Sequence, residues 1–380
     1  MEQIYLDHAA TTPMDERVIE TMYPVYKEVF GNPSSVHSFG RKARQLLDEA
    51  RRVMASSISA NEKEIIFTSG GTEADNLALI GTALANRDKG NHIITTNQEH
   101  HATLHTAEEL EKQGFKVTYL PVYENGKISA DDLKDALTDD TILVSIMFVN
   151  NETGIIQPIE EIGNLLKNHP AYFHTDAVQA FGLLDIDVIE MGIDLLSVSS
   201  HKINGPKGIG FLYVSEKVKL NALQYGGEQE RKRRAGTENV VGAAGFKTAV
   251  ELAISEKEER REKYQGFKLK FIEELAEKGI NFKINGDFES GIPSIVNISF
   301  PGTNVETLLT NFDLEGIGAS SGSACTAGSV EPSHVLKAMF GEDNQCTKNS
   351  IRFSFGIANT IENVTEAADR VAKIINRLIL

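Results

Sequence analysis

The feature that most constrains the fold is an alternation, from about residue 40 to residue 215, between helix-periodic stretches and short apolar runs. Such an alternation is typical of βαβ units stacked on a mostly parallel sheet. We expect one large α/β domain with a seven-stranded sheet. The predicted strands span residues 64–68, 92–96, 116–121, 142–149, 172–175, 195–199 and 210–214, and the predicted helices between them span 72–87, 103–113, 130–137 and 159–168.

A second, smaller domain is expected toward the C-terminus. A charge-rich, helix-periodic stretch over residues 253–279 predicts a connecting helix. The remainder has fewer strand patterns, a Gly/Ser-rich segment at 316–329 and a helical C-terminus, which is typical of an α+β domain. We place the large domain at 15–255 and the small one at 256–380, together with residues 1–14.

The bulk composition excludes several classes of protein. A formal net charge of −16 opposes direct binding to nucleic acid. The N-terminus lacks the basic start and apolar run of a signal peptide, and no apolar run reaches membrane-spanning length. We therefore expect a cytoplasmic protein without membrane contacts. Two cysteines, Cys325 and Cys346, are too few for a disulfide framework and are expected to be thiols.

Residues 69–76, Ser-Gly-Gly-Thr-Glu-Ala-Asp-Asn, follow an apolar run and open a helix-periodic stretch. The glycines allow an anion to approach the backbone, the unpaired N–H groups at a helix start favour negative charge, and Thr72 adds a hydroxyl donor. The segment thus has the features of a phosphate cradle. The same residues would also form an ordinary helix cap, so on its own the motif leaves both interpretations open.

Two further polar residues come directly after predicted strands, where parallel sheets bind their ligands. Asp176 is a helix-capping residue or a buried carboxylate paired with a cation, such as a protonated pyridinium nitrogen. Lys202 is a solvated lysine or one that forms a Schiff base. The order of a phosphate cradle, an aspartate and a lysine along the chain is the order that a pyridoxal 5'-phosphate site requires, and it favours the second reading of both residues.

At this point the sequence closely resembles the NifS/IscS-like (group I) cysteine desulfurases, class V members of the aspartate-aminotransferase-like (fold type I) pyridoxal-phosphate enzymes. The resemblance extends nearly from end to end. It rests on the stretches 5–12 (YLDHAATT), 31–37 (GNPSSVH), 68–73 (TSGGTE), 99–100 (EH), 149–154 (VNNETG), 174–179 (HTDAVQ), 200–202 (SHK), 234–237 (RAGT) and 320–326 (SSGSACT).

The resemblance implies roles for individual residues. Lys202 would attach the cofactor covalently, Asp176 would keep its ring nitrogen protonated, and Gln179 would bind its phenolic oxygen. His100 would stack on the ring and take part in proton transfer. The remaining cofactor contacts implied are Asn151 at the ring and Gly71, Thr72, Ser199 and His201 at the phosphate, with Thr237 contributed by the partner subunit of a homodimer.

The nucleophile is expected to be Cys325, which stands in a run of small and polar residues, whereas a buried structural cysteine rarely does. Arg352 fits a bidentate fork for the substrate carboxylate, although a surface ion pair is the alternative, and Asn32 is expected to assist it. Cys346 matches no motif, and we expect it to have no catalytic role.

Two other patterns are rejected as functional sites. His101 and His105 are four residues apart, as metal ligands on one helix face can be, but no Glu or Cys completes a set, and we expect no metal. The basic run 231–234 (RKRR) is short, stands in an acidic chain and directly precedes Gly236 and Thr237. We therefore interpret it as a subunit-interface loop rather than a nucleic-acid site.

The sequence as a whole predicts a cysteine desulfurase that converts L-cysteine to L-alanine and leaves a persulfide on Cys325. The sulfur would then pass to an acceptor protein, either an iron–sulfur scaffold or a tRNA-thiolating enzyme. A selenocysteine lyase or an aminotransferase on the same fold is the alternative among enzymes. A non-catalytic scaffold for sulfur-acceptor proteins is the alternative from another class.

Overall fold

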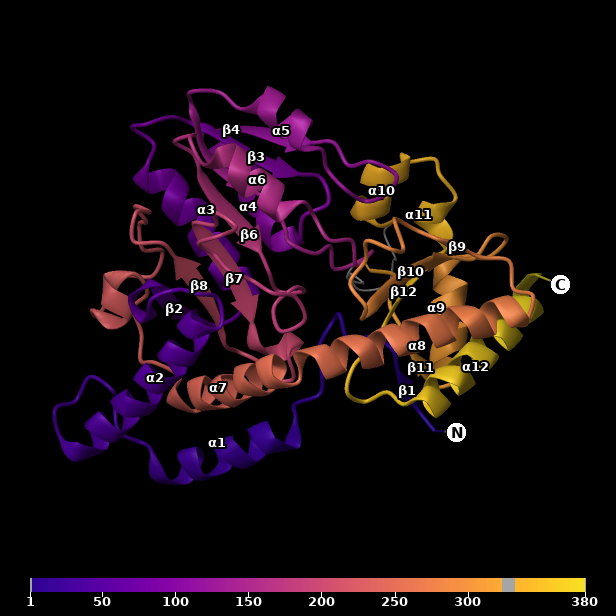
Figure 1. Cartoon of the computed structure of the whole chain (residues 1–380), viewed down its shortest axis with the longest axis horizontal. Coiled ribbons are helices and arrows are strands. Elements are labelled where there is room, and N and C mark those ends of the chain that lie inside the picture. Colours follow the sequence, from indigo (N-terminus) through magenta and orange to yellow (C-terminus); the bar gives the residue numbers. More distant parts are fainter. Residues whose placement is uncertain (1, 323–331, 380) are drawn as a thin grey trace.

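A computed structural model describes residues 2–322 and 332–379 (Figure 1). Its elements are β1 (Ile4–Tyr5), α1 (Glu16–Glu28), α2 (Ser38–Ser56), η1 (Glu62–Glu64), β2 (Ile65–Thr68), α3 (Gly71–Ala85), β3 (His92–Thr96), α4 (His101–Lys112), β4 (Lys116–Leu120), α5 (Ala130–Ala136), β5 (Thr141–Ser145), α6 (Ile159–Leu166), β6 (Tyr172–Asp176), β7 (Leu195–Ser199), η2 (Ser200–Lys202), β8 (Gly210–Val214), η3 (Gln229–Lys232), α7 (Val240–Ser255), α8 (Lys257–Glu277), β9 (Lys283–Ile284), β10 (Ile295–Ser299), α9 (Val305–Leu314), β11 (Ile317–Gly318), α10 (His334–Phe340), α11 (Cys346–Asn349), β12 (Ser350–Ser354) and α12 (Ile361–Ile379).

The large sheet confirms the predicted seven-stranded, mostly parallel architecture. Its strand order is β2-β8-β7-β6-β5-β3-β4. Only β8 runs against its neighbours, because it pairs antiparallel with both β2 and β7, while the other pairings are parallel. The carboxyl ends of the six co-directional strands therefore lie along one edge of the sheet. That edge is where an α/β protein of this kind binds its ligands.

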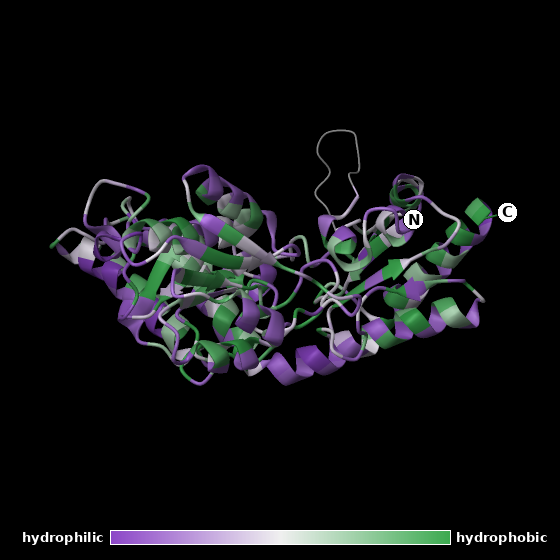
Figure 2. Ribbon diagram, turned by 90° about the horizontal axis from the view of Figure 1, so that it is seen from above, coloured by the Kyte–Doolittle hydropathy of each residue, from purple (hydrophilic) through white to green (hydrophobic). Residues whose placement is uncertain are grey.

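The sheet is covered on both faces, as the burial of its strands requires. Successive residues of a strand point to opposite faces. Accordingly, Ile93 and Leu143 join one apolar cluster with the inner side of α3, whereas their neighbours Ile94 and Val144 join another cluster with residues of α2, α6 and α7. Figure 2 shows the hydrophobic residues gathered in the strands and the hydrophilic ones mostly on the outer helices. Parallel strands buried on both faces explain the continuous apolar runs in the sequence.

Two predicted elements differ from the structure by more than two residues, and the other bounds agree within one or two residues. The strand predicted over 142–149 is shorter, since β5 ends at Ser145. The apolar run continues beyond it because Ile146 and Phe148 are still buried, and burial alone does not distinguish a strand from the irregular backbone that follows. The single helix predicted over 253–279 is divided at Glu256 into the end of α7 and the whole of α8.

The C-terminal region builds its own core around a three-stranded sheet, in the order β12-β10-β9. Helix α8 presents Phe267, Phe271 and Leu275 to this core, a spacing that places them on one helix face. The ring of Phe271 lies 4.7 Å from that of Phe353 on β12. Strand β1 pairs in parallel with β11, so the N-terminal residues join this core as well. The exact boundary between two domains stays a prediction.

A buried ion pair fixes the loop that precedes α7. Arg51 and Glu230 are both buried, and the guanidinium donates two hydrogen bonds of 2.7 Å to the carboxylate. Glu230, Arg231 and Lys232 all have positive φ angles, a conformation that is unfavourable for residues with a Cβ. We infer that the ion pair holds this strained turn against the sheet, where Glu230 also accepts the N–H of Phe67.

Replacing Arg51 by methionine should lower the free energy of unfolding by about 3–5 kcal/mol, because a buried carboxylate is left without its cation. The measurement is urea denaturation followed by circular dichroism. Arg44→Met is the matched control, since the Arg44–Asp48 pair is exposed and should contribute about 0–1 kcal/mol. Equal losses in the two variants would contradict the role given to Arg51.

No helix in the described part of the chain is long and apolar enough to cross a membrane.

Candidate active site

A cavity of about 330 Å³ opens at the carboxyl edge of the large sheet. Residues from widely separated parts of the sequence line it, because many of them lie at or shortly after the carboxyl ends of different strands. The lining includes Ala9, Ala10, Gly71, Thr72, Asp75, His100, Met147, Asn151, Asp176, Val178, Gln179, Ser199, His201, Lys202, Ser320, Gly322 and Arg352.

One wall of the cavity is the N-terminus of α3. Gly70 is the capping residue, with φ 155° and ψ −174°, a backbone conformation that is essentially restricted to glycine. No side chain among the described residues caps this helix. A Cβ at Gly71 would lie 2.9 Å from Val178 Cγ2, so the backbone approaches its neighbours closely there. The first N–H groups of the helix, Thr72 and Ser199 together form a cradle for an anion.

The floor of the cavity is a pair of buried carboxyl groups. Burial raises the pKa of Asp176 to about 6, although the N–H of Val178 and the charge of Lys202 lower it in part. Burial and the nearby Asp176 also raise the pKa of Asp75. Carboxylate atoms of both residues and a ring nitrogen of His100 lie within 4.8 Å of one another. Such an arrangement favours a cationic group between the acids.

Lys202 lies in the short turn η2 directly after β7 and points toward the N-terminal segment. Its ammonium group donates hydrogen bonds to the carbonyl oxygens of Ala9 and Ala10, the latter at 2.9 Å. Burial lowers the pKa of Lys202 to about 8, and the charge of Arg352 adds to the effect. A lysine with a lowered pKa has a larger neutral fraction at neutral pH and is correspondingly more nucleophilic.

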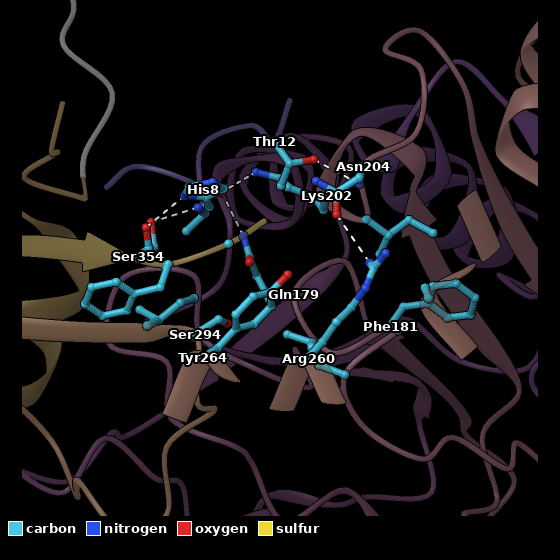
Figure 3. A pocket seen from close by; sticks show the side chains of 18 of the residues that line it. His8, Thr12, Gln179, Phe181, Lys202, Asn204, Arg260, Tyr264, Ser294 and Ser354 are labelled. Carbon is cyan, nitrogen blue, oxygen red and sulfur yellow. Dashed lines mark hydrogen bonds between the residues drawn. The ribbon is translucent and has the colours of Figure 1, made fainter. Parts of the chain in front are cut away.

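A second, smaller cavity of about 40 Å³ also has Lys202 in its lining (Figure 3). Arg260 donates to Asn204 Oδ1 at 3.3 Å, and the N–H of Asn204 bonds to Thr12 Oγ1 at 2.9 Å. Gln179 Nε2 donates to the Ala9 carbonyl at 3.0 Å. These bonds fasten the N-terminal segment to the turn that carries Lys202, so the lysine has a defined position.

His100 is the N-cap of α4, and its Nδ1 accepts the N–H of Ala102 at 3.1 Å. Nε2 must therefore carry the proton of the neutral ring. Burial lowers the pKa of His100 to about 4, and the charge of Lys202 contributes to the shift. The imidazole is thus neutral at physiological pH, with a donor N–H opposite the capping bond.

Arg352 is buried, so the alternative of a surface ion pair is wrong. It extends from β12 and donates to Asp7 Oδ1 at 2.7 Å and to the Asn151 carbonyl at 2.9 Å. Its Nε is buried and has no hydrogen-bond partner among residues 2–322 and 332–379. Part of its hydrogen-bonding capacity therefore remains for a carboxylate ligand.

The sequence matches known proteins along nearly its whole length. The Aminotransferase class-V family model matches residues 4–366. The chain belongs to this family. A Bacillus subtilis (strain 168) relative named IscS 1 is 62% identical over 378 residues, with 100% of each chain covered. A Clostridium botulinum (strain Hall) relative named cysteine desulfurase IscS is 49% identical, covering 99% of this chain and 95% of that protein.

Solved structures give the same result. A NifS-like protein superposes with a TM-score of 0.93 at 35% identity and covers 99% of this chain and 100% of that one. SspA in complex with cysteine superposes with a TM-score of 0.82 at 37% identity, covering 92% and 98%. The predicted fold and family are thereby confirmed.

Class-V enzymes use pyridoxal phosphate, and the cavity fits this cofactor. Its phosphate matches the glycine cradle at the start of α3, where no side chain of the described residues occupies the cap position. Its protonated ring nitrogen would stabilise the carboxylate of Asp176, whose pKa is raised by burial. Lys202 is the amine that would bind its aldehyde.

Two predicted site residues that the structure describes, Thr237 and Asn32, do not line this cavity. Thr237 is exposed, in a loop whose Arg234 pairs with Glu73 on α3 at 2.8 Å. Asn32 is exposed, and its Oδ1 accepts the N–H of Ser34. Cys325 lies outside the described residues, although Gly322, three positions before it, lines the cavity. Cys346, for which we predict no role, is buried on α11 and is not among the lining residues.

The structure also adds residues that the sequence interpretation missed. Asp75 lies at the floor of the cavity, and Asp7 is the ion-pair partner of Arg352. Asp7 stands within the stretch 5–12 that carries the family resemblance, and Asp75 within the glycine-containing motif 69–76, so the signal was present. What the sequence did not reveal is that the N-terminal segment crosses the site. The histidines His101 and His105 stack at 4.9 Å but do not join the cluster of Asp75, His100 and Asp176.

Proposed function

We propose that this protein is a cysteine desulfurase that transfers the sulfur of L-cysteine to Cys325. One observation carries the proposal. A class-V cofactor site with Lys202, Asp176 and His100 shares its cavity with a buried arginine and with Gly322, three positions before Cys325. In the reaction the C–S bond of the substrate breaks and an S–S bond forms at Cys325. Cysteine and the Cys325 thiol thus give alanine and a persulfide, with no external oxidant.

Each residue has a defined task in this scheme. Arg352 binds the substrate carboxylate, and Lys202 moves the proton at Cα. Neutral His100 donates a proton through Nε2 to a leaving or entering group. Asp176 would stabilise the positive charge on the ring nitrogen of the bound cofactor. The chemistry that pyridoxal phosphate supplies when bound is the withdrawal of electrons from Cα. A thiol nucleophile as a separate acceptor divides one difficult C–S cleavage into two easier steps.

The alternatives differ in their demand for Cys325. A selenocysteine lyase or an aminotransferase on this fold would not need the cysteine. A non-catalytic scaffold would need none of Lys202, Asp176, His100 and Cys325, whereas the first three line one cavity here. Names of relatives that include cysteine desulfurase further favour the desulfurase over both alternatives.

The persulfide can be located directly. The holoenzyme is incubated with L-cysteine without reductant, alkylated, digested and analysed by mass spectrometry. One additional sulfur on the peptide that contains Cys325, and none on the peptide that contains Cys346, is the expected result. Free alanine without a sulfur adduct at Cys325 would refute the proposed acceptor.

Replacing Arg352 by lysine should raise KM for L-cysteine about 10- to 100-fold and change kcat much less, because a charged group remains but the bidentate fork is lost. Initial rates of alanine formation over a range of cysteine concentrations measure both constants. Lys348→Arg, at an exposed position on α11, is the control and should change neither. A KM equal to that of the unmodified enzyme would contradict the role of Arg352.

We further propose a homodimer in which Thr237 reaches the phosphate of the partner's cofactor. Exposed apolar residues support a subunit interface on the side of α1, among them Tyr23, Tyr26, Phe30 and Phe39. Light scattering should give twice the 41.7 kDa of the chain. The sulfur acceptor is a protein, and whether it belongs to iron–sulfur assembly or tRNA thiolation is to be tested by persulfide transfer to purified candidates.

A further inference from the structure

Glu152 is a buried acid for which the proposed reaction has no use. It follows Asn151, which lines the cavity, and its residue is only 1% exposed. Burial raises the pKa of Glu152 to about 7, while Ser333 and the charge of Arg352 lower it. Burying a carboxyl group is unfavourable unless its hydrogen bonds are satisfied. The residues that contact the carboxyl group of Glu152 therefore indicate its role.

The carboxyl group of Glu152 contacts two residues that are eleven positions apart in the sequence. Ser333 Oγ donates a short hydrogen bond to Oε2. On the other side, a Cβ placed on Gly322 would lie only 2.5 Å from the same Oε2. Gly322 also has a φ of 90°, which favours glycine. One oxygen atom thus lies against both of these residues.

These two residues flank the stretch that contains Cys325. Ser333 is in addition the N-cap of α10, since its Oγ accepts the N–H of Leu336 at 3.1 Å. The main chain of Glu152 is itself fixed, because Asn150 Oδ1 accepts its N–H at 2.9 Å and its carbonyl accepts Asn297 Nδ2 at 3.2 Å. The acid is consequently a fixed group that accepts a hydrogen bond from one flank, Ser333, and packs closely against the other, Gly322.

We propose that Glu152 is a positioning residue, which fixes Gly322 and Ser333 relative to the cavity and thereby sets where the proposed nucleophile Cys325 is presented to the substrate. This inference rests on the proposed function. Misplacement of a reacting group by about 1 Å can lower a rate about 100-fold. The contribution of Glu152 should therefore appear in kcat and not in the binding of cysteine.

The first test uses the holoenzymes of Glu152→Ala and Ser333→Ala, each checked for unchanged cofactor absorbance. We expect kcat for alanine formation to fall about 100-fold in Glu152→Ala and by a smaller factor in Ser333→Ala, with KM within about twofold of the parent. Ser129→Ala is the matched control. It removes another N-cap serine, that of α5, and should leave kcat unchanged. An unchanged kcat in Glu152→Ala would overturn the proposal.

A raised KM for L-cysteine with an unchanged kcat in Glu152→Ala would also overturn the proposal. Glu152 would then act on substrate binding through the charge of Arg352. Hydrogen exchange gives a readout that does not depend on activity. In Glu152→Ala, amide exchange should accelerate about tenfold at residues 320–322 and 332–336 and stay unchanged in β6. Unchanged exchange at those residues would refute the positioning role of Glu152. If exchange accelerates in the variant but the unmodified enzyme forms no alanine, the positioning role stands and only the proposed reaction is refuted.

Discussion

Replacing Lys202 by alanine is expected to lower alanine formation about 1,000-fold or more and to remove the visible absorbance of the bound cofactor. The lysine is assigned two tasks, covalent attachment of the cofactor and transfer of the Cα proton, and no other lysine lines the cavity in the part of the chain that the structure describes. The measurements are the visible spectrum of the purified variant and its rate of alanine formation.

Lys207→Ala is the control for this experiment. Lys207 lies five residues further along the same region and is exposed, so its loss should affect neither the spectrum nor the rate. If Lys202→Ala kept the absorbance and the activity of the parent, the cofactor site would have been assigned to the wrong residue.

Replacing Cys325 by serine should lower sulfide and alanine formation about 1,000-fold while leaving the cofactor absorbance intact. A hydroxyl is far less nucleophilic than a thiolate at neutral pH, so sulfur has no acceptor in the variant. The variant should still bind L-cysteine, because Arg352 and Lys202 are unchanged. Stopped-flow spectra on addition of cysteine would show that binding.

Cys346→Ser serves as the comparison. Its side chain is buried on α11, away from the cavity lining, so the variant should be as active as the parent. Full activity in Cys325→Ser would mean that sulfur leaves the substrate by a route without a protein persulfide. Selenocysteine lyase or aminotransferase activity would then become the better explanation.

The large domain's strands could be located from sequence because parallel strands buried on both faces give continuous apolar runs. Three of the predicted strands, 92–96, 195–199 and 210–214, match β3, β7 and β8 residue for residue. The end of β5 could not be placed, since burial continues through Phe148. The division at Glu256 was also missed, because helix periodicity persists on either side of it.

In the candidate site, the features that depend on local sequence could be predicted, whereas the contacts between distant parts of the chain could not. Gly71 and Lys202 each follow a strand and Asp176 ends one, and the rule that ligands bind at the carboxyl edge brought them together correctly. The ion pair of Asp7 with Arg352 joins residues 345 positions apart, and the bonds of Lys202 to Ala9 and Ala10 span more than 190. No periodicity encodes such contacts, which depend on how the N-terminal segment packs.

The central claim is tested most directly by adding L-cysteine and a reductant to the purified holoenzyme and measuring alanine and sulfide over time. The account predicts equal amounts of the two products from the unmodified protein and neither from Cys325→Ser. A protein that carries the cofactor but forms no sulfide would contradict the desulfurase assignment and leave only the fold and the cofactor site in place.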